Sequence, residues 1–114
     1  MAREFSRSLK VAAQLQRVLN ELLRSNVKDP RLEGVRVNEV EVSGDLGVAK
    51  VFYGTLNPDD DPALAEEALD KACGFLRSRV GQAVKLRRVP ELRFIYDRSA
   101  QQGLALTRLI DESK

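Results

Sequence analysis

Four prolines punctuate this 114-residue chain, and each marks a place where a regular element has to begin or end. They stand at Pro30, Pro58, Pro62 and Pro90. No internal repeat and no glycine/serine-rich linker separates the apolar patterns between them. At about 100–200 residues per domain, the chain is long enough for one domain only. Because 43% of its residues are hydrophobic, that domain can bury a core.

The segment before Pro30 has the spacing of an amphipathic helix over residues 8–26. Ser8 is the expected N-cap, and the residue before Pro30 disfavours further helix. Apolar residues recur at i, i+3, i+4 and i+7, as one buried helical face requires: Val11, Leu15, Val18, Leu19 and Leu22. Three cations spaced by seven residues lie on the opposite face: Lys10, Arg17 and Arg24.

Two apolar runs before Pro58 predict a β-hairpin. Residues 35–42 alternate as a strand does, but the alternation changes phase near Asn38-Glu39, which predicts a bulge. Ser43-Gly44-Asp45 has turn chemistry. Residues 47–56 form the second predicted strand, and because it is apolar on both faces we expect it to be the central one.

The apolar pattern after Pro62 keeps a helical period from residue 64 to residue 86, with Asp61 as the expected N-cap. Gly74 interrupts that pattern, because glycine inside a helix costs about 1 kcal/mol relative to alanine. Two arrangements therefore stay open: one long helix that tolerates Gly74, or two helices that meet at a kink there. Residues 91–97 then alternate as a third strand, and residues 99–112 predict a short closing helix.

Two residue counts remove whole classes of chemistry: the chain has no His and one Cys, Cys73. A His-dependent nucleophile, an intrachain disulfide and a zinc site built on His or several Cys are impossible. Asp59-Asp60-Asp61 lacks the spacing of a calcium loop, and helix capping explains it better. No segment approaches the roughly 18 apolar residues of a membrane span. We therefore expect a cytoplasmic protein with neither metal nor cofactor, and no membrane partner.

Positive charge is concentrated in two segments, residues 1–28 and 71–98, with an acidic middle between them; residues 1–28 hold six basic and two acidic side chains. Residues 71–98 hold eight basic and two acidic side chains, whereas residues 29–70 hold three basic and eleven acidic ones. No Asp or Glu occurs between Lys71 and Glu91, although an ordinary solvated helix face mixes charges for i,i+4 pairing. If the helix continues, the polar residues of this stretch lie on one side of it: Arg77, Gly81, Lys85 and Arg88.

That side of the helix has the composition of a phosphate-binding surface; a solvated charged face is the alternative. We predict that Arg77, Lys85 and Arg88 contact phosphates, and that Gly81 permits close approach because it has no Cβ. Further candidate contacts are Arg79, Arg87, Arg93 and Arg98, and then Lys10, Arg17 and Arg24 of the first helix.

The few aromatic residues argue against recognition by base stacking, which needs exposed rings. Phe52, Phe75 and Phe94 are interpreted as core residues, and the aromatic run typical of an RRM does not occur. Binding is therefore expected to depend on phosphates and on shape.

Several short motifs follow one another along the chain. They are Lys28-Asp29-Pro30-Arg31-Leu32, Ser43-Gly44-Asp45-Leu46, Ala49-Lys50-Val51, Gly74-Phe75-Leu76-Arg77-Ser78, Leu86-Arg87, Pro90-Glu91-Leu92-Arg93-Phe94 and Asp97-Arg98-Ser99. Each motif alone is modest, but in this order and at these spacings they resemble the ribosome-binding factor A family. The resemblance covers about residues 3–110.

The resemblance implies an α+β, type II KH-like fold, ordered α-β-β-α-(kink)-α-β with a three-stranded sheet and a short C-terminal helix. It implies one KH-like RNA-binding domain over residues 1–114. An Ala-x-Gly interhelical kink, matched by Ala72, Cys73 and Gly74, would replace the G-x-x-G clamp of ordinary KH domains. Members of the family are non-enzymatic assembly factors that bind the small (30S) ribosomal subunit and its 16S rRNA during late maturation, and they are often linked to growth in the cold.

We therefore expect a monomeric RNA-binding factor whose partners are the small ribosomal subunit and its rRNA, with ribosomal proteins or other assembly factors beside them. Two other classes stay open. The acidic middle of the chain favours a protein–protein adaptor that docks a basic ribosomal protein. An enzyme is the third class, for which no catalytic constellation is present in the sequence.

Overall fold

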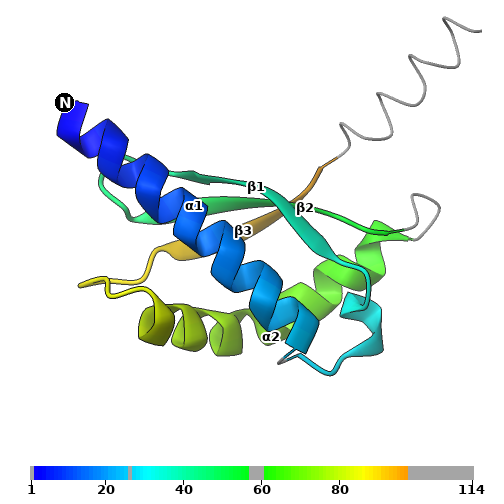
Figure 1. Ribbon diagram of the computed structural model, residues 1–114. Coiled ribbons are helices and arrows are strands. Elements are labelled where there is room, and N and C mark those ends of the chain that lie inside the picture. Colours follow the sequence, from blue (N-terminus) through cyan, green and yellow to red (C-terminus); the bar gives the residue numbers. More distant parts are fainter. Residues whose placement is uncertain (1, 26, 57–60, 98–114) are drawn as a thin grey trace, which may run out of the picture.

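The computed structural model describes residues 2–25, 27–56 and 61–97, with side chains from Arg7 onward. In chain order the elements are α1 (Ala2–Ser25), the 3-10 helix η1 (Pro30–Leu32), β1 (Arg36–Val42), β2 (Val48–Gly54), α2 (Pro62–Ala83) and β3 (Glu91–Tyr96) (Figure 1). This α-β-β-α-β order around one three-stranded sheet agrees with the type II KH-like arrangement. The closing helix predicted over residues 99–112 lies outside the described residues.

Helix α1 begins at Ala2 rather than after Ser8, so the prediction of Ser8 as the N-cap is wrong. Ser8 is buried inside the helix, where it shares one face with Val11, Ala12 and Leu15 at i+3, i+4 and i+7. Residues 2–7 contain neither proline nor glycine, so nothing in their composition ends the helix at Ser8.

The sheet has the order β1-β2-β3, which confirms β2 as the central strand. Strands β1 and β2 form the predicted antiparallel hairpin, and their register shifts between Val37 and Glu39, where the bulge was expected. Strand β3 pairs with β2 in parallel, with Val51 opposite Phe94. A parallel neighbour requires a long crossover, and α2 provides it.

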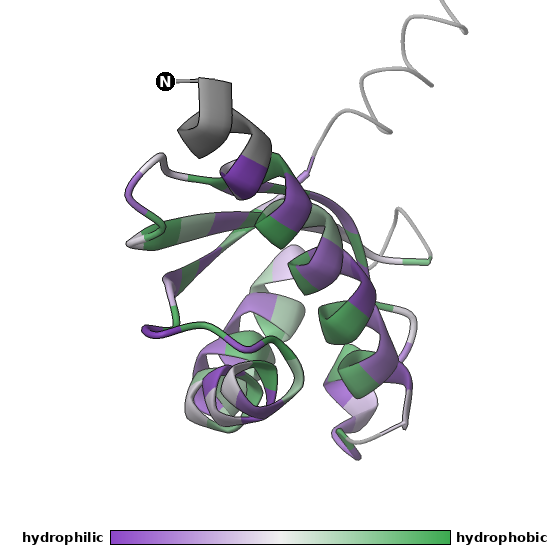
Figure 2. Cartoon of the chain, turned by 60° about the vertical axis from the view of Figure 1, so that its left-hand side comes forward, coloured by the Kyte–Doolittle hydropathy of each residue, from purple (hydrophilic) through white to green (hydrophobic). Residues whose placement is uncertain are grey.

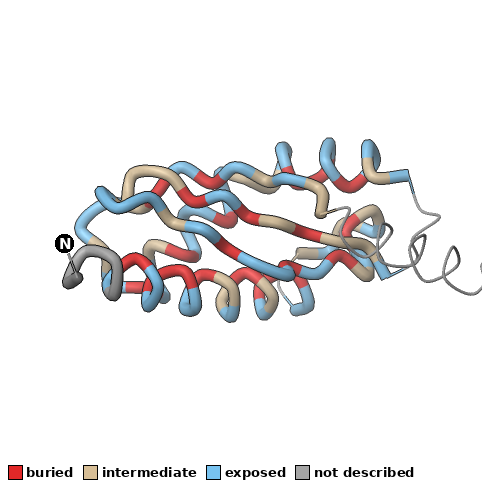
Figure 3. The backbone as a smooth tube through the Cα atoms, turned by 90° about the horizontal axis from the view of Figure 1, so that it is seen from above, coloured by how far each residue is buried: buried red, intermediate tan, exposed pale blue. Residues whose placement is uncertain are grey.

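Both helices pack on the same face of the sheet (Figures 1 and 2). The buried positions line the space between the helices and the sheet (Figure 3). The most deeply buried side chains come from α1, β2 and α2: Leu15, Leu19, Val51, Tyr53, Leu69, Leu76 and Val80. On β3, Leu92 points to this core, whereas its neighbours Arg93 and Ile95 are exposed on the other face.

Helix α2 runs without a break through Ala72-Cys73-Gly74, so one helix, not two, spans this region. Its axis nevertheless changes direction between its first and second half, so a bend takes the place of an interruption (Figure 1). Asp61 is the N-cap, as predicted, and its Oδ1 accepts a hydrogen bond of 3.0 Å from the N–H of Ala63.

Helix α2 ends at Ala83, three residues before the end that the periodicity predicts. Val84 is extended, with φ −109° and ψ 113°, and the N–H of Leu86 donates to its carbonyl at 2.7 Å. The buried, β-branched Val84 suits such a backbone. The chain has to turn back here, because Glu91 begins β3 by donating its N–H to the carbonyl of Gly47. Residues 84–90 therefore form the α2–β3 loop.

Candidate nucleic-acid interface

The early end of α2 changes the predicted site. Lys85 and Arg88 were expected on one helical face with Arg77, and that placement is wrong, because both residues belong to the α2–β3 loop. A helical period cannot be extended through Val84, whose backbone is extended. Lys85, Arg87 and Arg88 are nevertheless all exposed, so the loop presents three cations to solvent.

The α2–β3 loop folds back against one flank of α2. Nη2 of Arg77 donates a hydrogen bond of 3.2 Å to the carbonyl of Val89. A Cβ added to Gly81 would lie 2.9 Å from Cγ2 of the same Val89. The prediction that Gly81 is open to a phosphate is therefore wrong, because a side chain of the same molecule already occupies its free side.

Five exposed cations follow one another at the end of α2 and in the loop, and we call them the cationic cluster: Arg77, Arg79, Lys85, Arg87 and Arg88. Within residues 7–25, 27–56 and 61–97, no carboxylate forms an ion pair with any of them. Hydrogen bonds from Ser43 and Gly47 lower the pKa of Asp45, and the charge of Arg88 adds to this effect. Apart from that coupling, no carboxylate in the described part of the chain pairs with the cluster to neutralise its positive field.

The remaining cations that were predicted to contact RNA are not part of the cationic cluster. Arg93 is exposed on β3 but forms an ion pair of 3.4 Å with Glu91. Arg98 lies outside the described residues. Lys10, Arg17 and Arg24 are exposed along α1. At 1.5 Å per residue, about 21 Å separates Lys10 from Arg24, so these three do not form one cluster.

The interpretation of Phe75 as a core residue is also wrong. It is 40% exposed rather than part of the core, and the guanidinium carbon of Arg79 lies 5.2 Å from the centre of its ring. At about 100° per residue, Phe75 and Arg79 lie on one flank of Leu76, whereas Arg77 and Gly81 lie on the other. The buried positions Leu76 and Val80 already placed Phe75 at the margin of the apolar stripe.

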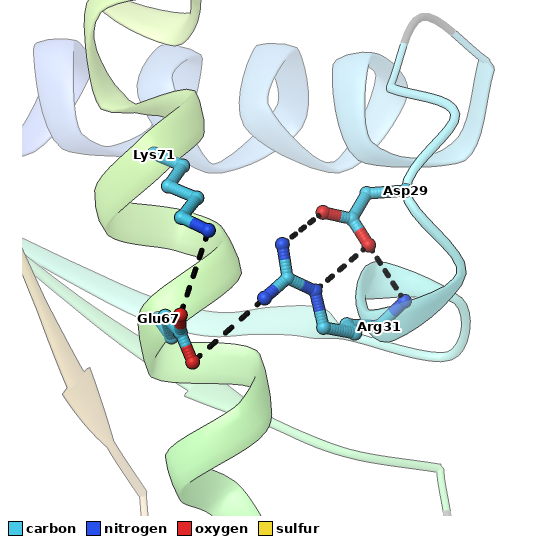
Figure 4. Close-up of polar contacts among 4 residues, drawn as sticks. All are labelled: Asp29, Arg31, Glu67 and Lys71. Atoms are coloured by element: carbon cyan, nitrogen blue, oxygen red, sulfur yellow. Dashed lines mark hydrogen bonds and ion pairs between the residues drawn. The ribbon is translucent and has the colours of Figure 1, made fainter.

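Two carboxylates of the acidic segment 29–70, those of Asp29 and Glu67, form ion pairs within the domain (Figure 4). Nε and Nη2 of Arg31 donate to the two carboxylate oxygens of Asp29 at 3.1 and 2.8 Å, and Nη1 lies 3.8 Å from Glu67. Lys71 pairs with the same Glu67 at 3.5 Å. The hydrogen bonds from Arg31 lower the pKa of Asp29. This network connects η1 to α2 and leaves fewer carboxylates for an acidic docking surface.

No group of three or more metal-ligating side chains occurs in the part of the chain that the structure describes. Asp61 of the acidic run caps α2, while Asp59 and Asp60 lie outside that part. Cys73 is partly buried, and this burial raises the pKa of its thiol. None of the described helices is long and apolar enough to cross a membrane.

The fold and the cationic cluster together define a class: a small α+β domain of the KH-like type with a basic surface at one helix end. A family model described as Ribosome-binding factor A matches residues 7–110. The Ribosome-binding factor A of Nitrosomonas europaea is 48% identical over 113 residues, which cover 99% of this chain and 97% of that protein. The chain belongs to the ribosome-binding factor A family.

Two structures of ribosome-binding factor A also resemble the fold of this chain. The crystal structure of ribosome-binding factor A from Thermus thermophilus has a TM-score of 0.69 and 29% identity, covering 78% of this chain and 94% of that one. A homology model of the Thermus thermophilus protein, fitted into the cryo-EM map of a 30S–RbfA complex, has a TM-score of 0.63 and 33% identity. It covers 76% of this chain and 91% of that one.

Proposed function

We propose that this protein is a ribosome assembly factor that binds the small (30S) ribosomal subunit and its 16S rRNA during late maturation. Residues 1–114 act as one KH-like RNA-binding domain in this proposal. The observation that carries it is the cationic cluster, whose five exposed side chains have no ion-pair partner among the described carboxylates. The family membership supports the same partner, because a relative is described in a complex with 30S.

The cluster would act through phosphates. Arg77, Arg79, Lys85, Arg87 and Arg88 supply charge-assisted hydrogen bonds to phosphate oxygens, which position the domain without reading base sequence. Arg77 keeps this capacity, because its bond to Val89 uses one of five guanidinium donors. Gly81 has a different role from the one first predicted: it lets the loop pack against α2.

The protein acts by binding and not by turnover in this proposal. A ligand shifts a conformational equilibrium only by its preference between the two states. Binding that favours one conformation of the rRNA therefore stabilises that conformation without a covalent step. The factor works in the cytoplasm, as a monomer, and its contribution is largest in the cold, when non-native RNA structures persist.

The decisive experiment removes the three loop cations together. Lys85, Arg87 and Arg88 make no hydrogen bond to the described residues, so Lys85→Ala/Arg87→Ala/Arg88→Ala should leave the fold intact. Cosedimentation with purified 30S subunits should weaken about tenfold or more, because charge-assisted contacts are lost. The matched control changes three exposed cations outside the candidate set and lowers the net charge equally: Lys28→Ala/Arg36→Ala/Lys50→Ala.

Equal binding of the two triple variants would contradict the proposal, since net charge alone would then explain the interaction. Association with a basic ribosomal protein that survives nuclease treatment, and that is lost when acidic residues of the middle segment are neutralised, would instead favour the adaptor.

A further inference from the structure

Phe75 exposes its ring on the flank of α2 that the α2–β3 loop leaves uncovered. The ring is 40% exposed, and the guanidinium of Arg79 lies 5.2 Å from its centre, one helical turn further along. No acidic residue occurs between Lys71 and Glu91 to pair with that guanidinium along the chain. An aromatic ring and a guanidinium thus lie together at the surface, and no described carboxylate forms an ion pair with the guanidinium.

We propose that Phe75 and Arg79 form a platform on which an unpaired RNA base stacks. This inference rests on the proposed function and extends it: the ligand is RNA with at least one unstacked nucleotide, not only a phosphate backbone. Bases stack on aromatic rings and on the planes of arginine guanidinium groups, and such contacts tolerate any base.

The arrangement of the pair favours stacking for a physical reason. Because the guanidinium of Arg79 already lies over the ring, a base that adds to the pair meets a partly preorganised surface. Arg77 has the opposite arrangement, because its guanidinium is tied to the carbonyl of Val89 on the other flank. The two arginines are two residues apart, yet only Arg79 combines a stacked partner with an uncovered flank.

The charge of Arg79 and of the loop on the other flank of α2 distinguishes RNA from a protein partner. A protein that buried the ring of Phe75 would also have to neutralise Arg79 and the loop cations with carboxylates of its own. A nucleic acid supplies both needs at once, since its phosphates neutralise the cations and its base covers the ring. The platform therefore extends the RNA contact of the cationic cluster to the other flank of α2.

The test compares stacking with simple charge. Arg79→Lys keeps the charge but removes the planar group, and Phe75→Leu keeps an apolar side chain but removes the ring. Arg36→Lys is the matched control, because Arg36 is an exposed arginine outside the cationic cluster and keeps its charge as lysine. The probes are a short mixed-sequence single-stranded RNA, the same strand annealed to its complement, and purified 30S subunits.

Wild type should prefer the single strand, and each of the two platform variants should bind it about 5- to 150-fold more weakly, the range for loss of one base–aromatic stack. Duplex binding and the salt dependence should change little in these variants, and Arg36→Lys should bind the single strand as the wild type does.

An unchanged single-strand preference in Phe75→Leu and Arg79→Lys would overturn the platform, even if the loop triple variant loses 30S binding as proposed. Loss of 30S binding without loss of single-strand binding would assign the pair to a ribosomal protein and would also overturn it. Failure of the wild type to bind 30S subunits would refute the proposed function itself.

Discussion

Gly81 and Val89 are in contact across the end of α2, so closely that a Cβ on Gly81 would lie 2.9 Å from Cγ2 of Val89. Real Cβ atoms essentially never approach that near, so a side chain at position 81 would push the loop away. Gly74, in the same helix, has no neighbouring atom within 4 Å of its added Cβ. The two glycines of one helix therefore have opposite structural requirements.

Alanine at these two positions should have opposite effects on stability. Gly74→Ala should raise the free energy of unfolding by about 0.5–1 kcal/mol, because alanine is the better helix former. Gly81→Ala gains the same propensity but overpacks against Val89, which typically costs about 1–3 kcal/mol. Urea denaturation followed by circular dichroism should place Gly81→Ala below Gly74→Ala.

Equal stability of the two variants would show that Val89 moves aside without cost. If Gly74→Ala instead destabilised the protein, the bend of α2 would depend on that glycine. The variant Gly81→Ala/Val89→Ala serves as the control, since removing Cγ2 of Val89 should make position 81 tolerant of alanine.

The affinity for rRNA should depend steeply on salt. If each of the five cations in the cluster neutralises one phosphate, the slope of log Kobs against log salt should be roughly −3.5 to −4.5. The triple variant of Lys85, Arg87 and Arg88 should bring the slope about 2 to 3 closer to zero, because three contacts are lost. Filter binding to a 16S rRNA fragment at several KCl concentrations measures this. A flat slope for the wild type would reject phosphate-driven binding.

The hairpin and its bulge could be predicted from sequence, because alternation has a period of two and a phase change is visible in the chain itself. The change near Asn38-Glu39 coincides with the observed register shift between Val37 and Glu39. The central position of β2 was predicted as well, because apolar residues on both faces of a strand favour a position inside the sheet. These features depend on the local order of apolar and polar residues, which can be read directly from the sequence.

The end of α2 could not be predicted in the same way, because tertiary contacts decide it. The apolar period continues past Ala83, yet Val84 turns into an extended conformation so that β3 can pair with β2. The roles of Gly81 and Lys85 changed with that turn. Phe75 was placed wrongly for a simpler reason: hydrophobic character was taken as burial, although its helical position lay at the margin of the buried face.

Arg31 should stabilise the connection between η1 and α2 in a manner that depends on pH. Its hydrogen bonds lower the pKa of Asp29 below the usual 3.8. The folded state therefore gains the full stabilisation above pH 3.8, and loses it as the pH falls through the lowered pKa. Arg31→Gln should therefore lower the urea midpoint at neutral pH, and the difference from wild type should narrow in acid.

The control for Arg31 is Arg36→Gln, which removes an exposed arginine that forms no ion pair with the described residues. Its urea midpoint should follow that of the wild type at every pH. A difference between Arg31→Gln and wild type that stays constant down to strong acid would show that the arginine acts through packing and not through the carboxylate of Asp29.

Tyr53 should control the stability of the fold in alkali. Burial raises its pKa to about 12, with smaller contributions from Glu66 and Asp70. Its ring packs edge to face against the ring of Tyr96, and the centres of the two rings lie 5.7 Å apart. Because the folded pKa lies above the unfolded value of 10, the neutral phenol contributes its full stability below pH 10 and loses it as the pH rises toward 12.

The measurement for Tyr53 is an absorbance titration of tyrosinate together with the urea midpoint at rising pH. One tyrosine of the wild type should ionise near pH 12, and this step should disappear in Tyr53→Phe, whose midpoint should fall less between pH 10 and pH 12. Tyr96→Phe is the matched control, because it removes the other phenol and leaves the buried one in place. If Tyr53→Phe lost stability in alkali as steeply as the wild type, deprotonation of other groups would have to account for the unfolding.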